Sequence, residues 1–460
     1  MEDDAIDYYF DDIETFHAEL KDILHQPYHN CQDAERLISR YIRFIMRFQH
    51  EFVQTTSDLA LVAYALLDSS LYLEYSTNLL THILCHHALS SSNPDELVVV
   101  YSILLLAGKE DARWMEYIVS EAKHNKQNRL FRKLLHEIHD SLGGEKLMGI
   151  MTNLGFEMCK VSKLRKNDLA LITVNYLDYL FNLVENTRGD NEETLNYNVI
   201  QLLLVFNEQF MMTPNSDNLV LTELTHRIGT TNTFSANLIF MLNRSDDACV
   251  QLLILKLLYG VFTLPALHEY FYTNDLYVLV DIALRELCNL GDERESEALR
   301  DAYLRVLRPM LINTQLRLNP YKQNEIYRTL CSLITPCMHK SIDATTKKLV
   351  QRILEEWWED VCKQPIAPVL GVHVKQAVIG SGQGQHAVMK ASASSRSSST
   401  SSFSSSPSPL SASPSFLSAS ISAIPNTPPD SLSPYPTSDD GKSPVLPLSQ
   451  SPKPYIHPTH

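Results

Sequence analysis

The stretch Leu252–Leu287, LLILKLLYGVFTLPALHEYFYTNDLYVLVDIALREL, decides the fold class. Apolar residues follow helical spacing up to Phe262. Pro265 then permits a new helix to begin, because proline lacks an amide that a first turn leaves unpaired anyway. Asn274 or Asp275 is placed to cap a further helix through a side-chain oxygen. The apolar residues of that helix recur at steps of three and four, which is typical of one buried face: Leu276, Leu279, Val280, Ala283, Leu284 and Leu287.

An aromatic corner, Tyr270-Phe271-Tyr272, lies between the predicted helices and leaves little room for a long loop. The segments on both sides have apolar stripes that need to be covered. We therefore predict that Phe271 is buried between its flanking helices.

The same helical period extends over almost every segment from Cys31 to Lys363, and almost no segment alternates as a strand would. Asn93 and Pro94 form a typical helix start. The connections are short, and no fixed repeat of the tetratricopeptide or ankyrin kind is present. These features predict an all-α fold, either a large bundle or, as we favour, an irregular armadillo-like α-solenoid. The later helices are predicted at Glu110–Ala122, Asn128–Ser141, Lys146–Cys159, Asn167–Asn186, Glu192–Met212, Asp217–Ile228, Asp246–Phe262, Asp275–Leu290, Glu293–Asn313, Tyr321–Met338 and Asp343–Cys362.

Composition divides the chain near Gln364. Of the 22 prolines, 15 lie from Pro365 onward, and Ser dominates from Ala391. Such a segment buries too little apolar surface to offset its chain entropy. We therefore predict three parts: an acidic, partly helical N-terminal segment over residues 1–30, a leucine-rich helical domain over 31–364, and a disordered Ser/Pro-rich tail over 365–460.

The formal net charge is −15, and the part before the tail carries −17, because the tail has five basic residues and three acidic ones. This charge argues against nucleic acid or an anionic membrane as the main partner. Met1–Glu19 has no basic segment of the kind that begins a signal peptide. The longest apolar runs, such as Leu97–Ala107, are shorter than the ~18 residues of a membrane span. Eight cysteines without CxxC pairs predict a reducing, cytoplasmic location.

No motif predicts catalysis, a metal or a cofactor. His82 and His86 lie four residues apart, a spacing that can bind zinc, but no Glu general base lies between them. We predict that these histidines are structural and that the protein is not an enzyme. Trp357 and Trp358 lie in an acidic segment of the kind that can bind a partner protein. Their helical spacing favours a terminal helix whose Trp pair closes the end of the fold.

Three segments carry a resemblance to a known family. They are Phe271–Leu287 (FYTNDLYVLVDIALREL), Tyr303–Arg317 (YLRVLRPMLINTQLR) and Pro320–Lys322 (PYK). They resemble the leucine-rich domain of the WISH/DIP/SPIN family, in particular its fungal members, and the resemblance is sharp over Leu252–Leu330. It implies a protein that binds the actin-related protein 2/3 complex and activates it without a pre-existing filament. The expected result is a linear actin filament, in cortical actin patches during endocytosis.

Basic residues concentrate in the same region and predict a docking stripe on an otherwise acidic body. The alternative is a solvated helix face with local ion pairs, each contributing about 0.3–0.5 kcal/mol. Reversing Arg305 and Arg308 to Glu is expected to retain the fold and weaken binding. The predicted partner-binding residues are Tyr272, Asn274, Arg285, Arg300, Arg305, Arg308, Lys322 and Arg328.

The tail contains two short proline motifs, Pro425-x-x-Pro428 and Pro444-x-x-Pro447, which are candidates for SH3 grooves. Neither has a basic residue at the spacing that those grooves usually require. An alternative function follows from these motifs, namely a generic helical-repeat scaffold of membrane traffic that recruits SH3 proteins.

Overall fold

The computed structural model describes residues 12–74, 77–121, 123–124, 127–187, 193–335 and 343–362. All of them belong to one compact unit. The predicted tail and its four SH3-candidate prolines, Pro425, Pro428, Pro444 and Pro447, lie outside the described residues.

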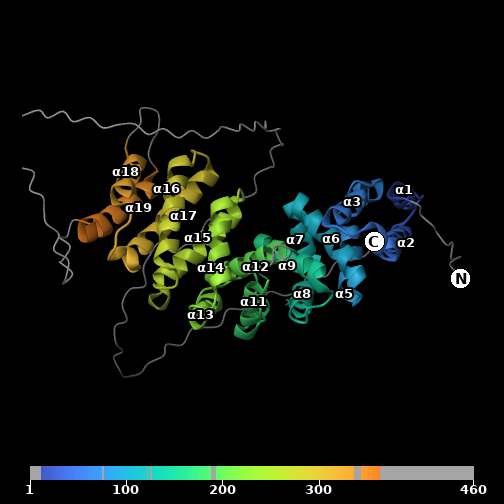
Figure 1. Ribbon diagram of the computed structural model, residues 1–460. Helices are drawn as coiled ribbons and strands as arrows, with labels where there is room; N and C mark the ends of the chain where they lie inside the picture. Colours follow the sequence, from blue (N-terminus) through green and yellow to red (C-terminus); the bar gives the residue numbers. More distant parts are fainter. Residues whose placement is uncertain are drawn as a thin grey trace, which may run out of the picture. The chain divides into compact units, whose positions relative to one another are not determined.

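Helices make up nearly all of the secondary structure of the described residues, as predicted (Figure 1). One pair of two-residue strands, β1 (Lys123–His124) and β2 (Gln127–Asn128), is antiparallel, with Lys123 opposite Asn128. The helices are α1 (Ile13–Leu24), α2 (Cys31–Phe52), α3 (Thr56–Leu67), α4 (Ser70–Glu74), α5 (Thr77–Ser90), α6 (Pro94–Glu110), α7 (Ala112–Glu121), α8 (Arg129–His139), α9 (Gly144–Val161), α10 (Lys166–Leu169), α11 (Val174–Asn186), α12 (Glu193–Met211), α13 (Leu219–His226), α14 (Asn232–Arg244), α15 (Ala248–Thr263), η2 (Pro265–Leu267), α16 (Thr273–Asn289), α17 (Arg294–Asn313), η3 (Gln315–Arg317), α18 (Gln323–Leu333), α19 (Ala344–Ile353) and η4 (Leu354–Cys362).

Six of these helices form a row in which each contacts the next, in the order α6, α9, α12, α15, α17 and α19. Most of them are apolar on more than one face, because they have neighbours on both sides within the row. The other helices flank this row; for example, α11 contacts α12, and α16 contacts α17. The described part of the chain is therefore all-α, with helices that pack in a row in chain order. That this row is an armadillo-like solenoid stays a prediction.

Local chemistry explains where several helices begin. Asn93 caps α6 by accepting from the amide of Asp95, with Pro94 in the first turn, as predicted. Thr55 and Asp58 form a reciprocal capping box at the start of α3. The connection before α9 turns through Gly143 and Gly144, whose φ angles of 74° and 75° suit glycine.

The structure differs from the predicted helices in several places. The predicted helix Asn167–Asn186 is two helices, α10 and α11, separated by a break before Thr173, which caps α11. Helix α14 is absent from the prediction, although Phe234, Leu238, Met241 and Leu242 have helical spacing. Pro265 begins only the short 3-10 turn η2, not a long helix.

The predicted cap of the helix after the corner is wrong. Helix α16 begins at Thr273, and Tyr272 occupies the N-cap position without a side-chain hydrogen bond. Asn274 and Asp275 therefore lie inside the first turn. An acidic residue there still stabilises the helix, because Asp275 faces the positive end of the helix dipole.

The core is one continuous apolar cluster that extends from Phe16 in α1 to Trp357 in η4. The helical part of the acidic N-terminal segment joins this core, since α1 contacts α2 and α3. Phe271 is only 1% exposed, which confirms its predicted burial. Trp357 is fully buried, and Trp358 stacks on Tyr327 at 4.3 Å, so the Trp pair packs as predicted for a terminal helix.

Candidate functional site

Three turns in the second half of the described residues are linked through the middle one, which contacts the first turn directly and the third through η3 and α16. They are the α13–α14 turn (residues 227–231), the turn before α16 (268–272) and the turn before α18 (317–322); we call them together the corner ridge. The hydroxyls of Thr231 and Tyr270 lie 2.7 Å apart and join the first turn to the second. The Gln315 side-chain amide donates to the carbonyl of Phe271 at 3.3 Å and joins η3 to the second turn.

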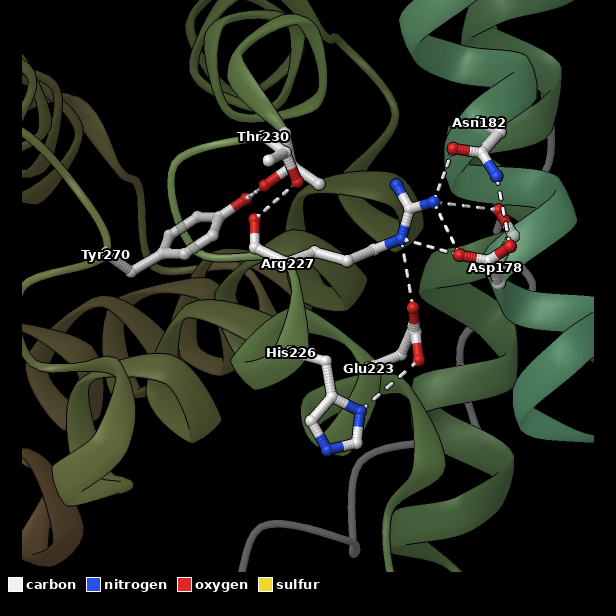
Figure 2. Close-up of polar contacts among 8 residues, drawn as sticks. Asp178, Asn182, Glu223, His226, Arg227, Thr230 and Tyr270 are labelled. Carbon is white, nitrogen blue, oxygen red and sulfur yellow. Dashed lines mark hydrogen bonds and ion pairs between the residues drawn. The ribbon is translucent and has the colours of Figure 1, made fainter.

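Arg227 holds the first turn in place (Figure 2). Its Nε donates to Glu223 at 2.9 Å, its Nη2 donates to Asp178 at 2.6 Å, and it also donates to Asn182. The guanidinium carbon lies 5.8 Å from the centre of the Phe181 ring, and only 12% of the side chain is exposed. Since a planar guanidinium binds several acceptors at fixed angles, this residue clamps the turn to α11 and α13.

The second turn places adjacent aromatic side chains in opposite environments. Tyr270 is largely buried, and burial raises the pKa of its hydroxyl above the ordinary value. Phe271 packs inside the core with its ring centre 5.7 Å from that of Phe262. Tyr272, in contrast, is 67% exposed. The burial of its two predecessors therefore fixes the backbone from which Tyr272 projects.

The third turn depends on an unusual backbone conformation at Lys322, whose φ is +47°. Its Nζ lies 2.9 Å from Asp281 on α16, and the bond with this carboxylate raises the pKa of Lys322. The neighbouring ring of Tyr321 stacks on Tyr277 of α16 at 4.2 Å. These two contacts hold the third turn against α16, the helix that the second turn begins.

One exposed apolar side chain projects from each turn: Ile228 (46% exposed), Tyr272 (67%) and Leu318 (81%). Large apolar side chains held on a rigid backbone are characteristic of protein-binding surfaces, because they contribute contact area at low conformational cost. The corner ridge is therefore the candidate functional site.

The structure divides the predicted partner-binding residues into two groups. Tyr272, Asn274 and Lys322 lie on or beside the corner ridge, and Arg328 is exposed on α18. Arg285 donates instead to Asn243 at the end of α14 and to Glu286.

The three remaining arginines do not form a continuous exposed stripe. Arg300 is buried, and it donates to the carbonyls of Leu290 and Gly291 in the α16–α17 connection. Arg305 is half-buried, and its charge acts on Asp301. Arg308 forms an ion pair with Glu356 on η4. The predicted role of these side chains in docking stays a prediction, but each of them already has contacts within the chain.

The ion pair of Arg308 with Glu356 argues against the expectation that Arg308 can be reversed without affecting the fold. Burial opposes ionisation of Glu356, but hydrogen bonds from Arg308 and Arg352 hold the pKa of Glu356 below its usual value. Arg308→Glu would replace an attraction with the repulsion of two carboxylates.

We expect Arg308→Glu to lower the free energy of unfolding by about 1–3 kcal/mol, because it replaces the ion pair between α17 and η4 with a repulsion. Arg328→Glu is the matched control on an exposed position and should change it by less than about 0.5 kcal/mol. Urea denaturation followed by circular dichroism measures both. Equal stabilities of the two variants would contradict the structural role of Arg308.

The two histidines that were considered as metal ligands have other neighbours. The Nδ1 of His82 lies 2.6 Å from a Glu121 carboxylate oxygen, and the ring of His86 lies edge-on to the ring of His87 with 6.4 Å between their centres. Within the described ranges, no three His, Cys, Asp or Glu side chains gather as metal ligands would. In the same residues, no helix combines the length and apolar character that crossing a membrane requires.

Sequence reasoning did not single out Ile228, Arg227 or Leu318. A signal existed for two of them: Ile228 precedes Gly229, whose φ is +81°, and Leu318 precedes an Asn-Pro turn. Arg227 could not be found in this way, because its partners Asp178 and Asn182 belong to a helix far back in the sequence.

The comparisons with known proteins agree with the resemblance. The family model described as SPIN90/Ldb17, leucine-rich domain, matches residues 192–326, which contain all three turns of the corner ridge. Among solved structures, an engineered protein aligns with 76% of this chain at 12% identity, but its TM-score of 0.26 is too low to bear on the fold.

Three fungal relatives match longer segments. Protein dip1 of Schizosaccharomyces pombe is 28% identical over 384 residues, which cover 78% of this chain and 97% of dip1. Protein LDB17 of Saccharomyces cerevisiae is 25% identical over 403 residues, covering 75% and 80% of the two chains. LDB17 of Eremothecium gossypii is 28% identical over 229 residues, covering 47% and 48%. The family-model match over residues 192–326 and the similarity to these fungal relatives are consistent with the resemblance of the sequence motifs to the WISH/DIP/SPIN family.

Proposed function

We propose that this protein binds the actin-related protein 2/3 complex and activates it without a preformed filament, so that linear actin filaments are seeded. The observation that carries the proposal is the similarity to dip1, which extends over 97% of the length of dip1 at 28% identity. The protein would act by binding rather than by catalysis, in the cytoplasm, at cortical actin patches during endocytosis.

The corner ridge is the surface that we propose for this binding. It lies within the matched family segment, and its exposed apolar side chains stand on turns that are fixed from behind by buried contacts. A rigid surface of this kind loses little conformational entropy when it docks.

Activation requires that the protein binds the active arrangement of the complex more tightly than the inactive one. To move the complex from mostly inactive to mostly active, the difference between the two binding free energies has to be roughly 5 kcal/mol. A rigid ridge can provide such a difference, because it cannot adapt to both arrangements equally well.

The test is actin polymerisation with the full chain, the purified complex and monomeric actin, without added filaments. We expect the native chain to shorten the lag before polymerisation. The double variant Tyr272→Ala, Leu318→Ser should lower the activity at least tenfold, because it removes two exposed ridge side chains. Its fold should persist, since both side chains are mostly in solvent.

The control is the double variant Tyr117→Ala, Leu73→Ser, which removes a similar pair of exposed side chains from α7 and α4. It should retain the native lag. An inactive native chain would refute the proposed function. Equal activity of both double variants would instead place the docking surface outside the corner ridge.

The alternative function, a scaffold of membrane traffic that recruits SH3 proteins, stays a prediction. Its motifs fall outside the described residues, and no feature of the described ones favours it.

A further inference from the structure

A second surface feature lies in the first half of the described residues. Helices α3, α6, α9 and α12 line a groove with a volume of about 520 Å³. It contains no residue of the corner ridge. Its floor is apolar and comes from all four helices: Leu59, Leu105, Leu106, Ile150 and Leu195.

The polar side chains of the groove are almost all uncharged. Asn153, Asn198 and three hydroxyl residues are among them, and the only two charges, Glu145 and Lys146, are opposite and adjacent. The Nζ of Lys146 already donates to the carbonyls of Val53 and Gln54, at 3.0 and 3.1 Å. The groove therefore suits an uncharged, apolar occupant better than an acidic or a basic one.

Gly149 keeps the groove open. It lies inside α9, where glycine costs about 1 kcal/mol relative to alanine. At Gly155, further along α9, a Cβ would already touch the Leu202 side chain at 3.4 Å. At Gly149 a Cβ would have only the Asn198 amide nitrogen nearby, at 3.7 Å. Packing does not require this glycine, and a side chain there would project into the groove.

The chain itself contains a segment with the matching chemistry. Leu410–Ala423, LSASPSFLSASISA, has no charged residue and presents Phe416, Leu417 and Ile421 among small side chains. Leu417 and Ile421 are four residues apart, the spacing that places two side chains on one face of a helix. Residues 363–409 separate this segment from the end of η4. We expect a linker of this length to allow the segment to fold back to the groove.

We propose that the groove binds the chain's own segment Leu410–Ala423, with Leu417 and Ile421 against its apolar floor. The binding mode is that of an apolar helix face in a hydrophobic groove. This contact is made within one chain, so its test does not depend on whether the protein nucleates actin.

Hydrogen–deuterium exchange of the full chain tests the proposal. Amides of residues 410–423 should exchange at least fivefold more slowly than those of the flanking residues 431–438. Gly149→Arg fills the groove, and Ile421→Glu places a charge on its apolar floor. Each should abolish this protection.

Each of these two variants has a matched control: one changes the same glycine to a small residue, and the other places the same charge elsewhere in the segment. Gly149→Ala adds only the Cβ for which the groove has room, and Ala419→Glu places the same charge on the opposite face of the segment. Both should keep the protection. Thermal unfolding checks that each variant is folded; if Gly149→Arg is not, Asn153→Arg fills the groove from the next turn of α9.

Three results would overturn the proposal. The segment 410–423 could exchange as fast as its flanks in the native chain. Its protection could persist in the folded groove variants, which would place it elsewhere. Protection that appears only at high protein concentration would assign the contact to a second copy of the chain.

Discussion

Glu208→Ala is expected to lower the free energy of unfolding by about 3–5 kcal/mol, because it leaves a buried ammonium without its carboxylate. Glu208 on α12 and Lys256 on α15 form an ion pair, and both side chains are almost fully buried. Water cannot replace the lost carboxylate at this depth. Urea denaturation of the full chain, followed by circular dichroism, measures the change.

A second variant separates the lost charge from the lost packing. The double substitution Glu208→Leu, Lys256→Met should recover most of the stability, since a buried ion pair can be replaced by apolar residues of similar volume at little cost. The exposed pair of Asp33 and Arg36 provides the control, and Arg36→Ala should cost less than about 1 kcal/mol. If Glu208→Ala lowers the free energy of unfolding by no more than Arg36→Ala does, water reaches the pair of Glu208 and Lys256 more easily than its burial indicates.

Phe271→Ala is expected to lower the free energy of unfolding by about 3–5 kcal/mol, because the ring fills space between α15 and the turn before α16. Removal of the ring also frees the backbone from which Tyr272 projects. We therefore expect this variant to lose actin-seeding activity at temperatures well below its unfolding transition. Thermal unfolding and the polymerisation assay, carried out on the same preparation, measure the two effects.

The next residue along the chain is the matched control. Tyr272 is two-thirds exposed, so Tyr272→Ala should change the free energy of unfolding by less than about 0.5 kcal/mol. Phe271→Leu keeps most of the apolar volume and should be tolerated much better than Phe271→Ala. A negligible stability loss in Phe271→Ala would mean that the turn is held together without this ring.

The periodicity of apolar residues was enough to predict the all-α fold, most helices and the burial of Phe271. This succeeded because helix formation and the direction of a side chain on a helix are set by residues three or four positions away. The start of α6 at Asn93 and Pro94 was predictable for the same reason. The family was recognisable because its motifs lie in continuous stretches.

The site residues depended on contacts that no local pattern contains. Arg308 and Arg300 look like exposed cations at helical spacing, yet one binds Glu356, 48 residues away, and the other is buried against the connection before α17. The spacing of residues on a helix sets which of them share a face, but it does not set which neighbouring helix covers that face.

The exposure of side chains on the corner ridge also depends on tertiary packing. Tyr270, Phe271 and Tyr272 are all aromatic, and only the packing of the α13–α14 turn, α15 and η3 around the first two leaves Tyr272 in solvent. The sequence alone therefore determined most helices, the family resemblance and the burial of Phe271, because these follow from local periodicity and continuous motifs. Tertiary packing alone decided which polar and aromatic side chains remain available to a partner, because exposure depends on neighbours that are distant in the chain.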